Sequence, residues 1–304
     1  MRNNIRAAVV QAGSIFMDRQ RSLEKAAHFI AEAGAEKAQL IVLPEAFLPG
    51  YPRGLAFGTA VGERSEAGRA LFRAYYENAI EIPGPETDAL CKQAKEVAAH
   101  ITIGVVERER ERQGTLYCTL LFIGPDGTLL GKHRKIKPTA AERYLWGEGD
   151  GASLRVYDSD IGRLGGLICW ENKMPLARMA LYRQGVELYV APTADNRETW
   201  QATIRHIADE GRCFVFASNQ FITKADYPPE LQQLPELEAA AEPFCRGGSA
   251  IIDPFGRYLA GPLLDEEGIL YADCDLGQIA GARFDFDVVG HYTRPDIFHF
   301  SVKK

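Results

Sequence analysis

The chain has 304 residues, of which 46% are hydrophobic and 25% charged, an ordinary composition for a soluble globular enzyme. Its 35 basic and 41 acidic side chains give a formal charge of −6, so no basic surface is expected to neutralise the phosphates of a nucleic acid. No apolar run reaches the ~18 residues that a membrane span needs, and we expect no association with membranes.

The amino-terminal residues and the spacing of the cysteines predict the cellular compartment of the protein. Residues 1–4 lead straight into a strand-like run, without the pattern of a signal peptide. Six cysteines occur at long, irregular spacings, and a chain of this size can bury a core without disulfides. We therefore expect a reduced, cytoplasmic protein.

Strands and helices alternate along the first third of the chain. Hydrophobic periodicity and the positions of proline and glycine predict a strand at 5–12, a helix at 18–37, a strand at 39–43, a loop at 46–63, and helices at 65–80 and 86–100.

Short strands and hairpins follow. The predicted elements are strands at 101–107, 116–123 and 128–134, a hairpin of 154–157 with 163–169, a helix from Pro175 to near Gly185, a strand at 187–191, a helix at 199–211, a strand at 213–220 and two or three strands within 247–273. This pattern predicts an α/β fold in which mixed sheets are covered by helices.

Residues 222–245 form a segment of different composition. They contain four prolines and five acidic side chains against one lysine. The segment is either an exposed loop or a lid, and the usual behaviour of loops favours the first interpretation.

Cys169 is the first candidate for chemistry. It ends the apolar run 164–168 and precedes the helix expected at Pro175. The positive field at a helix N-terminus lowers the pKa of a thiol, which would supply a nucleophilic thiolate near neutral pH. The alternative is a small buried hydrophobic residue, and the other five cysteines fit that interpretation.

Glu45 and Lys135 are the other candidates. Glu45 follows a buried strand and Pro44, so its pKa is expected to be raised if it is unpaired, as suits a general base. A helix cap or a surface ion pair is the alternative. Lys135 lies in a basic run at 132–137 and either protects a sheet edge or points inward to stabilise developing negative charge.

Several other chemistries lack their sequence patterns. The histidines are scattered, and neither Cys-x-x-Cys nor His-Glu-x-x-His occurs, so no metal site is expected. The glycine-rich stretch 147–151 lacks the lysine of a phosphate-binding loop, and no Gly-x-Ser-x-Gly elbow is present.

Taken together, four segments resemble the motifs of the nitrilase superfamily of carbon–nitrogen hydrolases. They are Leu43-Pro44-Glu45-Ala46-Phe47, His133-Arg134-Lys135-Ile136-Lys137-Pro138-Thr139, Thr139-Ala140-Ala141-Glu142-Arg143 and Gly166-Leu167-Ile168-Cys169-Trp170-Glu171-Asn172. The resemblance implies a catalytic triad of Glu45, Lys135 and Cys169, with Glu142 as a second glutamate, and no metal or cofactor. It also implies an α-β-β-α sandwich, with one domain over residues 1–280 and a tail over 281–304.

The residues after Cys169 are similar to those of the nitrilase branch. Cys169-Trp170-Glu171-Asn172 is followed by Met174-Pro175-Leu176-Ala177-Arg178, and the stretches 146–151 and 191–195 agree with that branch. The resemblance implies hydrolysis of a small-molecule nitrile to a carboxylic acid and ammonia through a thioimidate and a thioester on Cys169. An amidase or carbamoylase with the same triad and a catalytically silent binding protein are the alternatives.

Aromatic side chains near the motifs predict an apolar pocket for aryl-acetonitriles or mid-sized aliphatic nitriles. The expected substrate-binding residues are Phe47, Tyr51, Trp146, Trp170 and Thr193.

The resemblance also implies a homodimer or larger homo-oligomer. In the helix at Pro175 the residues Leu176, Met179, Ala180 and Leu181 are expected to form an apolar stripe, flanked by Arg178 and Arg183 as polar rim. The alternative is that this stripe only packs on the sheet.

Overall fold

A computed structural model describes residues 4–303, and its strands form two mixed sheets. The first sheet has the order β13 (Gly268–Asp275), β1 (Asn4–Gln11), β2 (Leu40–Val42), β3 (His100–Arg108), β4 (Leu116–Ile123) and β5 (Leu129–Arg134). β1, β2 and β3 run parallel, whereas β13, β4 and β5 pair antiparallel with their neighbours.

The second sheet has the order β10 (Phe221–Ile222), β11 (Cys245–Ile252), β9 (Phe214–Ala217), β8 (Leu188–Val190), β7 (Gly162–Gly166) and β6 (Tyr157–Ser159), and β12 (Tyr258–Leu264) pairs with β11. Only β7, β8 and β9 are parallel. Each sheet therefore combines a parallel centre with antiparallel edges.

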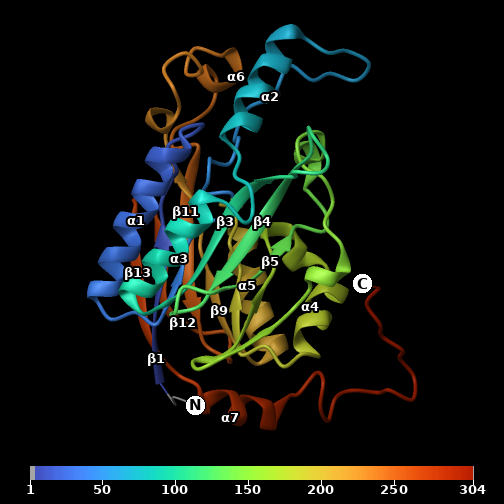
Figure 1. The fold of residues 1–304 in the computed structure, drawn as a ribbon. Coiled ribbons are helices and arrows are strands. Elements are labelled where there is room, and N and C mark those ends of the chain that lie inside the picture. Colours follow the sequence, from blue (N-terminus) through green and yellow to red (C-terminus); the bar gives the residue numbers. More distant parts are fainter. Residues whose placement is uncertain (1–3, 304) are drawn as a thin grey trace.

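Helices cover the outer face of each sheet (Figure 1). α1 (Arg19–Ala35) and α3 (Pro85–Val97) lie side by side on the first sheet, and α4 (Pro175–Tyr182) and α5 (Glu198–Gly211) lie on the second. α1 begins where the Asp18 carboxylate accepts the Arg21 N–H at 2.9 Å. α3 begins at Pro85, whose missing N–H costs nothing in a first turn.

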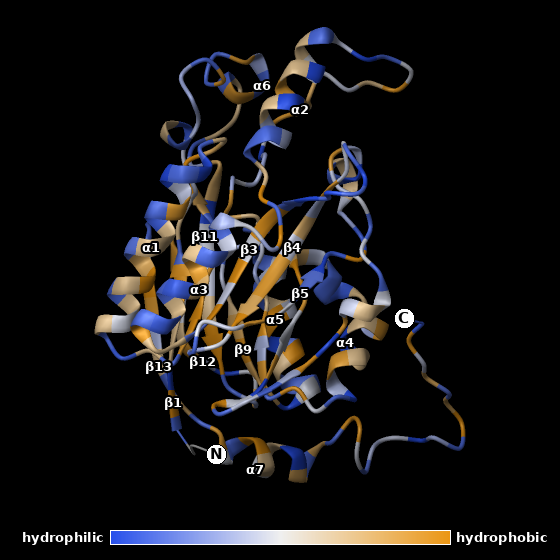
Figure 2. Ribbon diagram, viewed as in Figure 1, coloured by the Kyte–Doolittle hydropathy of each residue, from blue (hydrophilic) through white to orange (hydrophobic). Residues whose placement is uncertain are grey.

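Three apolar cores separate the four layers. The central core joins the inner faces of the sheets and includes Val9 and Val190; the outer two lie under the helix pairs and include Ile30 and Trp200. Both faces of the central strands are thus buried, which explains their nearly continuous apolar sequence (Figure 2). The predicted α-β-β-α sandwich is confirmed.

Three further helices lie outside the pairs that cover the two sheets (Figure 1). α2 (Glu66–Asn78) and α6 (Pro235–Glu238) project from the same end of the molecule, and α7 (Gly277–Asp285) leads into a C-terminal stretch with no further helix or strand among its described residues. The segment 222–245 is more than an exposed loop, because Tyr227, Leu237 and Phe244 are buried in the central core. Whether it acts as a lid stays a prediction.

Two local expectations need correction. The predicted hairpin is shorter and shifted, pairing Tyr157 with Leu164 and Ser159 with Gly162, because the chain leaves the sheet after Gly166 to form the turn at Cys169. In α4 the apolar residues divide between two faces: Leu181 is fully buried in the core, whereas Leu176 is 70% exposed. Arg178 is not a rim residue, because it is buried and paired with Glu210.

Candidate active site

Glu45 lies in a tight turn directly after β2. The turn passes so close to β3 that a Cβ added to Gly104 would lie 2.5 Å from the Pro44 oxygen and 2.6 Å from the Glu45 Cα. Phe47 N–H donates to the Gly104 carbonyl at 2.7 Å, and Gln220 Nε2 donates to the Glu45 carbonyl at 2.5 Å. These contacts hold a fully buried carboxylate between the two sheets.

Lys135 follows the last residue of β5 and points inward. Its Nζ donates to Glu45 Oε1 at 2.7 Å and to Glu142 Oε2 at 2.8 Å, and its side chain is fully buried. Glu142 lies in the short 3₁₀ helix Ala140–Tyr144, where it also accepts the Tyr51 hydroxyl at 2.7 Å and the Thr139 N–H at 2.6 Å. One ammonium is thus shared between two carboxylates.

Cys169 begins the 3₁₀ helix Cys169–Lys173 in a left-handed conformation, with φ of 51°. Its N–H donates to the Pro192 carbonyl at 2.8 Å, and the Thr193 hydroxyl donates to its sulfur at 3.2 Å. A non-glycine residue with positive φ is strained, and such strain is typical of active-site turns. The turn after β7 therefore presents the thiol to the residues that follow β2 and β5.

The electrostatics of the thiol correct the sequence-based expectation. Burial, together with the nearby Glu45 carboxylate, raises the pKa of Cys169 rather than lowering it, and Lys135 and the Thr193 hydroxyl offset only part of this shift. The helix α4 begins six residues later, so Cys169 lies outside the first turn of α4, where the field of a helix acts. At rest the sulfur is therefore a protonated thiol that needs a base.

Glu45 has the properties of that base. Burial raises the pKa of Glu45, although its contact with Lys135 works in the opposite direction. Its Oε2 is buried and has no hydrogen-bond partner in residues 4–303, so one oxygen stays available to a proton. Burial disfavours the charged form of Lys135, but Glu45, Cys169 and Glu142 outweigh that effect and raise the pKa of Lys135. The lysine stays cationic.

A buried carboxylate connects the lysine segment to the cysteine turn. Glu171 accepts the Ile168 N–H at 2.9 Å on Oε2 and the Ile136 N–H at 2.6 Å on Oε1. His133 Nε2 lies 3.0 Å from Oε2, and the Glu171 side chain is fully buried. Because Ile136 and Ile168 adjoin Lys135 and Cys169, Glu171 fixes the two segments relative to each other.

A cavity of about 210 Å³ opens beside Cys169. Its lining residues are Tyr51, Arg53, Thr139, Glu142, Cys169, Trp170, Ala194, Asp195, Asn196 and Arg197. Tyr51 and Trp170 thus lie where the sequence-based expectation places them. Cys169 itself is only 4% exposed, so a ligand that reaches the sulfur must enter this cavity.

The other predicted binding residues lie elsewhere or make different contacts. Phe47 does not line the cavity; it is fully buried in the core between the first sheet and its helices, because the side chain follows the turn at Glu45 to the opposite face. Trp146 is buried and is not among the residues that line the cavity. The centre of its ring lies 5.7 Å from Lys135 Nζ. Thr193 contacts the sulfur.

The sequence did not predict that polar residues also line the cavity beside Cys169. Arg53 lies in the expected loop 46–63, and Asn196 and Arg197 directly follow the motif-like stretch 191–195. No periodicity marks such loop positions, and only the fold brings them to Cys169. The cavity is consequently more polar than the aromatic residues near the motifs predict.

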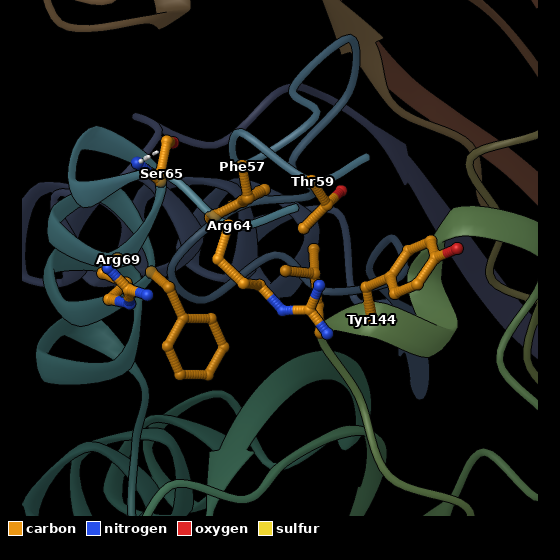
Figure 3. A pocket seen from close by; sticks show the side chains of 9 residues that line it. Phe57, Thr59, Arg64, Ser65, Arg69 and Tyr144 are labelled. Atoms are coloured by element: carbon orange, nitrogen blue, oxygen red, sulfur yellow. Dashed lines mark hydrogen bonds between the residues drawn. The ribbon is translucent and has the colours of Figure 1, made fainter. Parts of the chain in front are cut away.

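A separate hollow of about 250 Å³ lies between α2, the loop before it and Tyr144 (Figure 3). Phe57, Thr59, Arg64 and Arg69 line it, and none of the triad residues does.

Within residues 4–303, no helix is long and apolar enough to cross a membrane, and no cluster of three or more His, Cys, Asp or Glu side chains is arranged to hold a metal ion.

Comparison with known proteins agrees with this arrangement. Residues 6–284 match the carbon–nitrogen hydrolase family. The chain is 51% identical to the bifunctional nitrilase/nitrile hydratase NIT4A of Lupinus angustifolius, over 98% of this chain and 86% of that protein. It is 48% identical to nitrilase 2 of Arabidopsis thaliana, over 99% of this chain and 89% of that protein.

Solved structures share the fold at lower identity. Nit3 of Saccharomyces cerevisiae, a member of branch 10 of the nitrilase superfamily, has a TM-score of 0.74 and 23% identity, over 96% of this chain and 97% of that chain. The matches over nearly the whole sequence, on a sandwich with a Glu-Lys-Cys cluster at its centre, show that this chain belongs to the nitrilase branch of the carbon–nitrogen hydrolase family.

Proposed function

We propose that this chain hydrolyses an organic nitrile to the carboxylic acid and ammonia, with Cys169 as nucleophile. The observation that carries the proposal is the contact of Lys135 Nζ with both Glu45 and Glu142. The buried Cys169 thiol lies next to this cluster and lines a cavity. The nitrilases to which the chain is about half identical support the same reaction.

In the first step the sulfur adds to the nitrile carbon. Because the resting thiol is protonated, its proton passes to Glu45 as the S–C bond forms, and the nitrile nitrogen takes up a proton to give a thioimidate. Lys135 stabilises the negative charge that builds on nitrogen, and its ammonium is held in place by Glu45 and Glu142. Tyr51 and Thr139 orient Glu142 in turn.

In the second step water adds to the thioimidate carbon. Breaking the C–N bond of the tetrahedral intermediate releases ammonia and leaves a thioester. A further water, which loses its proton to Glu45, then attacks the thioester; the S–C bond breaks, and the acid and the free thiol are formed. The nitrile thus consumes two waters for each acid and ammonia produced.

An amide is the expected second product. If the tetrahedral intermediate breaks its S–C bond instead of its C–N bond, the nitrogen is retained and an amide leaves. Several relatives are named as nitrile hydratases as well as nitrilases, which favours this branch in the present chain.

The test is a panel of nitriles and their matching amides, with nitrile, amide and acid followed by chromatography and ammonia measured in parallel. We expect nitrile consumption, with acid and ammonia formed in equal amounts and any remainder recovered as amide. Faster turnover of the amides than of the nitriles would indicate an amidase. No turnover of any compound would indicate a silent binding protein.

We propose a cytoplasmic homodimer or larger homo-oligomer, a single catalytic domain over residues 1–280 and a tail over 281–304. Exposed apolar residues at the start of α4, Met174 at 37% and Leu176 at 70% exposure, support pairing through this helix.

A further inference from the structure

The cavity beside Cys169 contains two arginines with different surroundings. Arg197 donates to Asp195 Oδ1 at 2.8 Å through Nε and to Oδ2 at 2.6 Å through Nη2, and its guanidinium lies 4.6 Å from the centre of the Trp170 ring. The charge of Arg197 is therefore offset within the protein. Arg53, by contrast, forms no ion pair with an Asp or Glu of residues 4–303.

The guanidinium of Arg53 is only partly satisfied. Nη2 donates to the carbonyl of Ala194, whereas Nε is buried and has no hydrogen-bond partner in the described part of the chain. A buried cationic donor without an acceptor has lost its hydration without compensation. A ligand that supplies an anionic acceptor here would remove that cost.

The carboxylates at the cavity are already engaged. Asp195 accepts from Arg197 and from the Trp170 indole N–H at 2.8 Å. Glu142 accepts from Lys135, Tyr51 and Thr139. Their negative charges are offset by these partners, so an incoming anion meets one cation that no protein carboxylate neutralises.

We propose that Arg53 binds a carboxylate of the substrate, so that this chain acts on nitriles with an acid group at the end remote from the nitrile. The inference deepens the proposed function and rests on it. A guanidinium binds a carboxylate through parallel N–H donors, which gives orientation as well as affinity. With Arg53 and Cys169 lining the same cavity, the acid group is held by Arg53 while the nitrile carbon reaches the sulfur.

The size of the cavity limits the substrate. A volume of about 210 Å³ is below the usual range of pockets for drug-sized ligands, which is about 300–1,000 Å³. Short aliphatic cyano-acids therefore fit better than bulky aryl-acetonitriles. Tyr51 and Trp170 would then flank the methylene chain.

The test compares two nitriles of the same length and shape. One is cyanobutanoate with the nitrile on its terminal carbon, and the other carries an uncharged isopropyl group in place of the carboxylate. We expect the wild-type chain to favour the acid in kcat/KM by about tenfold or more, as charge-assisted hydrogen bonds allow. Arg53→Met should remove this preference, because KM rises by about tenfold or more for the acid and much less for the uncharged nitrile.

Two further variants sharpen the result. Arg53→Lys keeps the charge without the paired donors and should lie between wild type and Arg53→Met. Arg64→Met, at an exposed arginine in the separate hollow of Figure 3, should leave the preference unchanged. If Arg53→Met does not fold, Arg53→Lys and Arg53→Gln carry the comparison.

If Arg53→Met lowers kcat/KM equally for both nitriles, the inference is overturned, because Arg53 would then only hold the Ala194 carbonyl in place. A wild-type chain that turns over both nitriles without preference would also overturn it and leave the proposed function intact. Failure to turn over either of the two nitriles or any nitrile of the wider panel would instead contradict the proposed function itself.

Discussion

At the scale of single residues, two neighbouring lysines have opposite surroundings. Lys135 is fully buried between Glu45 and Glu142, whereas Lys137 is half-exposed and pairs with Glu148 at the surface. We expect Lys135→Ala to lower kcat by about a hundredfold or more, because it removes the charge that stabilises the developing anion.

Lys137→Ala is the matched control, and its nitrile turnover should stay within about twofold of wild type, because exposed ion pairs contribute little. Melting temperatures establish that both variants are folded. A larger loss for Lys137→Ala than for Lys135→Ala would show that the wrong lysine has been assigned.

The pKa of Glu45 predicts the acid side of the pH profile. The active form of a general base is unprotonated, and burial raises the pKa of Glu45, so its proton is lost only at higher pH than for an ordinary glutamate. Activity should therefore fall as the pH drops, with an apparent pKa above the usual value of about 4.3.

The measurement is kcat/KM for one nitrile from about pH 3.5 to about pH 9, so that the range includes the ordinary glutamate pKa. Glu45→Gln should be inactive over this whole range, because an amide cannot accept the proton. An acid limb at or below the ordinary glutamate pKa, or an active Glu45→Gln, would contradict the role given to Glu45.

At the scale of elements, the Glu171 contacts predict the coupling between β5 and the cysteine turn. Both oxygens of Glu171 accept backbone N–H groups, so Glu171→Gln must turn its own N–H₂ toward one of them. We expect a loss of about 2 kcal/mol in the free energy of unfolding, from one unsatisfied buried donor. Because the turn that holds Cys169 shifts, kcat should fall by about tenfold or more while KM changes less.

Asp160→Asn is the control for this variant. Asp160 accepts from His100 at 2.8 Å, in another pair of a buried histidine with a carboxylate, but one that contacts none of the triad residues. Its kcat should equal that of wild type. An equal loss of kcat in both variants would contradict a specific positioning role for Glu171.

The elements were largely predictable from sequence, because strands buried on both faces are nearly all apolar. The proximity of Glu45 to Lys135 was also predictable, because the motifs that contain them are each contiguous, while their catalytic roles stay predictions. The local field at Cys169 was not, since it depends on Glu45, which lies more than a hundred positions away in sequence and comes close only in the fold. The same holds for Phe47, whose direction follows from a turn with positive φ at Ala46. Arg53 lies in a loop without periodicity, so its place in the cavity required the structure.

At the scale of the whole molecule, we expect α4 to connect assembly to activity. Leu176 is exposed on this helix, whereas Arg178 on its buried side donates to the Asn172 carbonyl at 2.9 Å, and Asn172 Nδ2 donates to the Cys169 carbonyl at 2.9 Å. If pairing holds α4 in place, it also holds the cysteine turn.

Leu176→Asp should therefore produce monomers with reduced nitrile turnover, because it places charge in the proposed apolar interface. Light scattering at the assay concentration gives the oligomeric state. A fully active monomer, wild-type or variant, would contradict the coupling.

The central claim is that Cys169 forms a covalent intermediate with a nitrile, and mass spectrometry of the protein during turnover tests it most directly. We expect an added mass equal to a thioimidate or acyl group, located by peptide mapping on Cys169 and on none of the other five cysteines. Cys169→Ala should show neither adduct nor turnover, with an unchanged melting temperature. An adduct on another cysteine, or nitrile hydrolysis by Cys169→Ala, would contradict the account.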